Sequence, residues 1–117
     1  MTLHQKQARF TLFVARLIDK AVEMGYTPVL GEVQRSQAQA LQNAKLGTGI
    51  ANSLHVDRLA VDLLLFRDGK YLDKTEDYLH LGQWWKSLDP ACCRWGGDFT
   101  NRRDGNHFSY SPDGKRA

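Results

Sequence analysis

Residues 59–66 read Leu-Ala-Val-Asp-Leu-Leu-Leu-Phe, a dense apolar run that is broken at one position by Asp62. A run of this length and composition is typical of a buried strand, and we expect it to be the central strand of a sheet. Burying a bare carboxylate is costly, so Asp62 must be paired, hydrogen-bonded or bound to a metal ion. The stretch therefore predicts both the centre of the fold and an unusual polar group inside it.

The segments on either side of this run predict the other elements. Residues 67–70 contain the strong turn signal Asp-Gly and predict a hairpin. Residues 10–24 carry apolar side chains with helical spacing, and Gly25 is placed to end that helix. The remaining predicted elements are a strand at 26–33, a helix at 37–45 capped by Ser36, a helix at 78–88 and a final strand at 107–110. The chain contains no internal repeat or linker, so we predict one α+β domain over residues 1–117 with its core at about 10–110.

The composition is that of a folded protein of one domain. The 117 residues are 42% hydrophobic and 25% charged, which argues against disorder. The net charge of +3 favours polyanionic surroundings, a description that fits a cell wall and nucleic acid equally well. Adjacent Cys92 and Cys93 could pair only in a strained ring, so both are expected to be reduced thiols. We see neither a signal peptide nor an apolar run of membrane-spanning length, and we expect no membrane insertion.

Polar residues that could carry chemistry lie at two places. His55 precedes Asp62 by seven positions, and Asp104 precedes His107 by three, just before the final predicted strand. Two imidazoles and a carboxylate suit zinc, and a catalytic zinc ion usually keeps three protein ligands with a fourth position for water. The spacing alone is weak evidence, because both histidines could be ordinary hydrogen-bonded residues and Asp104 could simply form a turn ahead of Gly105.

In combination these stretches resemble a known family. Ser-x-His at 53–55, Leu-Ala-Val-Asp-Leu at 59–63, Trp-Gly-Gly-Asp at 95–98 and Asp-x-x-His at 104–107 follow one another in this order. They resemble the zinc D-alanyl-D-alanine carboxypeptidases and L-alanyl-D-glutamate endopeptidases, which include the vancomycin-resistance-type D,D-carboxypeptidases and several phage endolysins. The resemblance runs from about Leu12 to Tyr110. It implies a small antiparallel sheet flanked by helices, with a zinc site like that of the D-Ala-D-Ala peptidases and the hedgehog signalling domains.

The resemblance also implies the roles of the polar residues. His55, Asp62 and His107 would bind Zn2+, and Asp104 would be the general base. Many relatives have a glycine in the stretch between the first histidine and the alanine, where this chain has Val-Asp-Arg-Leu at 56–59. Because the spacing is unchanged, we expect an altered loop shape and a retained zinc site.

Three further residues are candidates for contact with the substrate, and the resemblance implies the first of them. The stretch at 31–36 matches a family segment that brings an arginine into the site, so Arg35 would stabilise the oxyanion or hold a substrate carboxylate. Arg35 could instead form a surface ion pair with Glu32. Ser53 and Trp95 are weaker candidates for substrate contact, since Ser53 could cap its loop and Trp95 could belong to the core.

The implied activity is that of a zinc metallopeptidase that hydrolyses peptidoglycan stem peptides. We expect a phage endolysin that cleaves between L-alanine and D-glutamate; the alternatives are a D,D-carboxypeptidase of the same family and a non-catalytic zinc-binding module. The presence of Asp104 argues against the module, because a structural site needs no base. No recognised nucleic-acid-binding motif is present, so bacterial peptidoglycan is the expected partner of a monomer. The expected location is the cytoplasm of an infected bacterium, followed by release to the cell wall.

Overall fold

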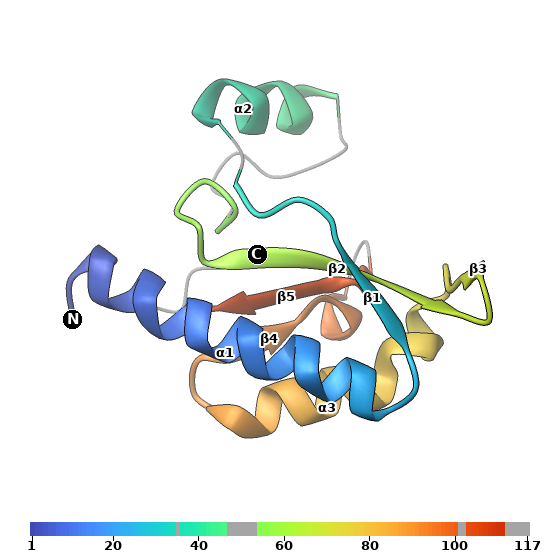
Figure 1. Ribbon diagram of the computed structural model, residues 1–117. Coiled ribbons are helices and arrows are strands. Elements are labelled where there is room, and N and C mark those ends of the chain that lie inside the picture. The colour runs from blue at the N-terminus through green and yellow to red at the C-terminus, as the bar shows by residue number, and fades with distance from the viewer. Residues whose placement is uncertain (35, 47–53, 101–102, 112–117) are drawn as a thin grey trace.

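The structure is a computed structural model that describes residues 1–34, 36–46, 54–100 and 103–111. Its elements in chain order are α1 (Leu3–Glu23), β1 (Thr27–Leu30), α2 (Gln37–Lys45), β2 (Ala60–Arg67), β3 (Lys70–Tyr71), the 3-10 helix η1 (Thr75–Tyr78), α3 (Leu79–Leu88), β4 (Cys93–Trp95), the 3-10 helix η2 (Gly96–Asp98) and β5 (His107–Tyr110). The predicted α+β class, with a small antiparallel sheet and flanking helices, is confirmed (Figure 1).

Strand β2 lies in the middle of the sheet, as the apolar run predicts. The strand order is β1-β2-β5-β4, with β3 paired to β2, and every pairing is antiparallel. The hairpin between β2 and β3 turns at Asp68 and Gly69, whose φ angles are 53° and 76°. Positive φ at both central residues is what a type I′ turn requires, and this explains the Asp-Gly pair.

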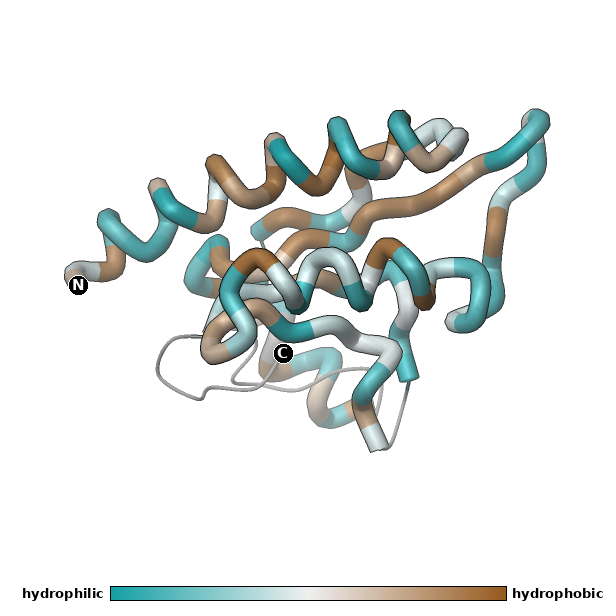
Figure 2. Tube along the Cα trace, turned by 90° about the horizontal axis from the view of Figure 1, so that it is seen from below, coloured by the Kyte–Doolittle hydropathy of each residue, from teal (hydrophilic) through white to brown (hydrophobic). Residues whose placement is uncertain are grey.

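The two faces of the sheet have different environments. Along β2, alternate side chains of Val61, Leu63 and Leu65 are fully buried, whereas Asp62 lies on the opposite face and is only partly buried. Helices α1 and α3 pack against each other and cover the apolar face, and α2 lies apart on the other side of β2 (Figure 1). Figure 2 shows the alternation of hydrophobic and hydrophilic segments along α1 that this packing requires. The hydrophobic core therefore lies on one side of the sheet, and the other side carries Asp62.

Three elements differ from their sequence-based predictions. Strand β1 ends at Leu30, three residues before the predicted end of the strand at 26–33. Helix α1 begins at Leu3, seven residues before the predicted start, because Thr2 and Gln5 form a capping box. Its first turns are polar and extend past the core, so apolar spacing could not locate them. Strand β4 was not predicted, since its three residues precede two glycines that suggest irregular structure. By contrast, α2, its Ser36 cap and β5 have the predicted bounds.

Two further features of the described part of the chain concern the cysteines and the helices. Both Cys92 and Cys93 are free thiols. None of the helices described is both long enough and apolar enough to cross a membrane.

Trp95 connects α3, β4 and the loop that leads into β5. Its side chain is 3% exposed, and its indole N–H donates to the carbonyl oxygen of Gly105 at 2.7 Å. Gly82 of α3 lies directly against the indole ring, and a Cβ atom at that position would overlap it. The absence of a side chain at Gly82 therefore lets α3 approach β4 closely enough to hold this tryptophan in place.

We predict that Gly82→Ala lowers the free energy of unfolding by about 1–3 kcal/mol, because the added methyl group displaces Trp95 from a packed site. Alanine is intrinsically the better helix former by about 1 kcal/mol, so a loss of stability would report the packing clash alone. Urea unfolding measures the change. Gln83→Ala, at an exposed position of the same helix, is the control. A Gly82→Ala protein as stable as the parent would show that the contact does not constrain the fold.

Candidate metal centre

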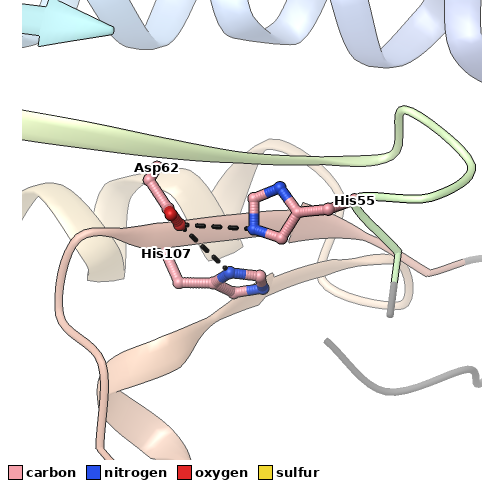
Figure 3. A group of neighbouring side chains, drawn as sticks. All are labelled: His55, Asp62 and His107. Atoms are coloured by element: carbon pink, nitrogen blue, oxygen red, sulfur yellow. Dashed lines mark ion pairs between the residues drawn. The ribbon is translucent and has the colours of Figure 1, made fainter. Parts of the chain in front are cut away.

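Three side chains far apart in sequence meet on the face of the sheet that carries Asp62. Asp62 of β2 is the direct cross-strand partner of His107 on β5, and directly opposed residues project from the same face. His55 lies in the turn that precedes β2, where the backbone N–H of Leu59 donates to the carbonyl of Leu54 at 2.9 Å. Figure 3 shows His55 and His107 converging on the carboxylate of Asp62.

The distances within this group fit a bound metal ion. Asp62 Oδ1 lies 3.4 Å from His55 Nε2 and 3.4 Å from His107 Nδ1. One candidate ligand atom from each residue can be chosen so that all three lie within 4.8 Å of one another. A distance of 3.4 Å is long for a hydrogen bond. It agrees with the separation of about 3.3 Å expected between two ligands that bind a tetrahedral ion at about 2.0–2.1 Å. The three residues could therefore hold a metal ion without a large rearrangement.

The burial of this group supports the same conclusion. His55 is 2% exposed, His107 is 4% exposed, and Asp62 Oδ1 is a buried oxygen with no hydrogen-bond partner in the described part of the chain. A buried acceptor without a partner costs about 1–3 kcal/mol, so such an atom calls for a ligand. Burial by itself would raise the pKa of Asp62, but the close approach of the His107 and His55 rings outweighs it and lowers the pKa from 3.8 to about 2. Asp62 is therefore an anion at neutral pH, as a metal ligand must be.

Asp104 is connected to this group through the backbone. Its N–H donates to the carbonyl of Gly96 at 3.0 Å, and its own carbonyl accepts from the N–H of His107 at 3.1 Å. The side chain is exposed. The tight turn from Asp104 to His107 thus places an accessible carboxylate immediately before one of the candidate ligands. Its action as a general base stays a prediction.

The other predicted substrate contacts have different outcomes. Arg35 and Ser53 lie outside the described residues. Trp95 is buried, with its indole N–H engaged by Gly105, so the contribution that the structure shows is support of the loop before β5. A contact between Trp95 and substrate stays a prediction.

The position of Glu32 beside His55 was not predicted from the sequence. Glu32 Oε1 lies 3.7 Å from His55 Nδ1, on the side of the imidazole away from Asp62. The only partner considered from sequence was Arg35. The sequence carries no signal for this contact, because it follows from the pairing of the first two strands, which spacing along the chain does not determine.

Comparison with known proteins places the chain in a family. A family model described as D-alanyl-D-alanine carboxypeptidase matches residues 47–110, which is more than half of the chain. Among solved structures, the fold is similar to that of the L-Ala D-Glu endopeptidase ChiX from Serratia marcescens. The TM-score is 0.65 and the identity 21%, over 83% of this chain and 77% of that chain. No curated protein matches the chain.

The matched region contains all three candidate ligands together with Asp104. The order of motifs seen in the sequence, the convergence of His55, Asp62 and His107 on one face of the sheet, and the family match agree with one another. The chain belongs to the D-alanyl-D-alanine carboxypeptidase family.

Proposed function

We propose that this protein is a zinc-dependent peptidase that hydrolyses the stem peptides of bacterial peptidoglycan, with cleavage between L-alanine and D-glutamate as its activity. The observation that carries the proposal is the position of Asp62 Oδ1, a buried oxygen without a hydrogen-bond partner in the described residues, at 3.4 Å from one nitrogen of each histidine. The family match supports the peptidase activity.

Zinc is the metal ion that best suits these donors. Two imidazole nitrogens and one carboxylate oxygen form a common ligand set of catalytic zinc, which keeps a fourth position open for water. When bound, zinc acts as a Lewis acid and lowers the pKa of a coordinated water to about 7. Asp62 supplies one negative charge, so the site as a whole stays cationic and can attract the carbonyl oxygen of a peptide.

The protein residues would then handle the proton and the developing charge. A carboxylate oxygen of Asp104 accepts a proton from the attacking water and delivers it to the nitrogen of the leaving amine. The guanidinium of Arg35 stabilises the oxyanion or holds a carboxylate of the substrate, whose planar oxygens match its fork of N–H donors. Both roles come from the family resemblance, and the exposure of Asp104 supports the first.

The choice of scissile bond rests on a fold likeness and on the resemblance in sequence. ChiX is an L-Ala D-Glu endopeptidase of similar fold. Several phage endolysins share the sequence motifs, and we extend the proposal to an endolysin that acts as a monomer on the cell wall after release. The family description favours a second candidate, removal of the terminal D-alanine by a D,D-carboxypeptidase.

Digestion of purified peptidoglycan, with product analysis by mass spectrometry, tests the function. Samples with added zinc and samples with a chelator are compared. We expect new L-alanine C-termini and matching D-glutamate N-termini, both abolished by the chelator and restored by zinc. Release of terminal D-alanine alone would contradict the endopeptidase and support the carboxypeptidase. Absence of any product from protein that binds zinc would contradict the peptidase and point to a non-catalytic zinc-binding module.

The base role of Asp104 predicts a separation of metal binding from catalysis. Asp104→Asn keeps the size of the side chain but removes the proton acceptor, so turnover should fall by about 100- to 10,000-fold. Zinc content, measured by mass spectrometry of the metal after dialysis, should stay at the parent level. Asp19→Asn, at an exposed position of α1 on the other side of the sheet, is the matched control. Near-normal turnover of Asp104→Asn would exclude the base role.

A further inference from the structure

We propose that Glu32 is a positioning residue that holds the imidazole of His55 in the orientation and tautomer needed to bind the metal ion. The inference rests on the proposed metal site and extends it to a residue outside the ligand set. Its structural basis is the contact between Glu32 Oε1 and His55 Nδ1, at 3.7 Å, on the far side of the ring from Asp62.

The backbone places Glu32 beside the site independently of its side chain. Pairing between the first two strands continues past the end of β1: the N–H of Gly31 donates to the carbonyl of Asp62 at 2.7 Å, and the N–H of Asp62 donates to the carbonyl of Glu32 at 2.9 Å. A Cβ atom at position 31 would lie 3.1 Å from both the Cβ and the carbonyl oxygen of Asp62. Gly31 thus permits the close approach that brings Glu32 next to the ligand-bearing strand.

The chemistry of imidazole makes this position useful. A neutral imidazole carries its proton on one nitrogen and offers a lone pair on the other. His55 faces Asp62 through Nε2, so metal binding requires the lone pair on Nε2 and the proton on Nδ1. A carboxylate beside Nδ1 favours that tautomer, because the N–H can donate to it. Carboxylates that support a metal-binding histidine in this way also raise its basicity.

The observed distance is compatible with such support. At 3.7 Å, Glu32 Oε1 lies about 0.5 Å beyond the usual limit of an N–H···O hydrogen bond, which is about 3.2 Å. The glutamate side chain is 36% exposed, whereas the ring of His55 is 2% exposed. A decrease of about 0.5 Å in the distance between the two atoms would bring the contact within hydrogen-bond range.

His107 provides an internal contrast. It faces Asp62 through Nδ1, and in the part of the chain that the structure describes no carboxylate lies within ion-pair distance of its buried Nε2, whereas Glu32 lies 3.7 Å from His55 Nδ1. Neither of these two nitrogens is within hydrogen-bond distance of a described acceptor. The ring of His107 is packed against Phe99, with centroids 5.5 Å apart. The rings of the two histidines also contact each other edge to face, with centroids 5.1 Å apart. They therefore differ in what lies beside each ring away from Asp62: Phe99 packs against His107, and the carboxylate of Glu32 lies beside His55.

Zinc affinity is the first test. Glu32→Gln and Glu32→Ala are compared with the parent protein by competition against a fluorescent zinc chelator, and the fold of each is checked by circular dichroism. We expect Glu32→Ala to bind zinc about 10- to 100-fold more weakly, with a smaller loss for Glu32→Gln, which keeps an acceptor oxygen. Glu23→Gln, which removes the same charge from an exposed ion pair with Lys20 on α1, should bind like the parent.

The tautomer of His55 is the second test, and it needs no metal. In zinc-free protein the carboxylate of Asp62, 3.4 Å from Nε2, competes with Glu32 for the single proton of His55. Nitrogen NMR of histidine-labelled protein at about pH 8, where imidazoles are ordinarily neutral, measures the share of His55 that is protonated on Nδ1. In Glu32→Ala the population should shift towards the form protonated on Nε2. Parent affinity and parent tautomer in both Glu32 variants would overturn the inference and leave the proposed peptidase intact. Failure of the parent protein to bind zinc would contradict the proposed function, and the tautomer measurement would still decide the role of Glu32.

Discussion

The pairing of Asp62 with His107 across β2 and β5 is the constraint on which the rest of the structure depends. In an antiparallel sheet this register sends both side chains to one face and their neighbours Val61 and Phe108 to the other. A slip of one residue would turn Asp62 into the hydrophobic core and expose Leu63 in its place. The cost of burying a carboxylate among apolar side chains excludes that alternative. The same choice of register thus builds the core and the candidate metal centre.

Because the sheet separates the hydrophobic core from the candidate metal centre, different interactions stabilise the two regions. On the core face, Trp85 of α3 meets the rings of Phe10 and Phe13 from α1 and of Phe108 from β5 edge to face, at centroid distances of 6.0–6.2 Å. On the other face, two of the three candidate ligands are fixed by the strands that this core supports. His55 comes from a turn, so the orientation of its ring depends more on contacts with neighbouring side chains. Glu32 is the neighbour to which we assign this role. Side chains that project from rigid strands and are packed or hydrogen-bonded by their neighbours keep the positions that metal binding and catalysis require.

The sequence predicted the parts of the fold that have a regular pattern. The apolar run around Asp62, the Asp-Gly turn and the Ser36 cap each have a local physical cause, and the structure contains all three elements. The meeting of His55, Asp62 and His107 could be predicted only from the family resemblance, because spacing along the chain does not determine which strands pair. The same reason explains what was missed: β4 is too short to show a pattern, and the contact of Glu32 with His55 follows from the register between β1 and β2.

Diffraction from zinc-loaded crystals at the zinc absorption edge tests the central claim most directly, since anomalous scattering locates the metal without assumptions about its ligands. The account predicts one strong peak within about 2.0–2.2 Å of His55 Nε2, His107 Nδ1 and a carboxylate oxygen of Asp62. A fully occupied zinc ion bound to other side chains, or the absence of any peak on the Asp62 face of the sheet, would contradict it.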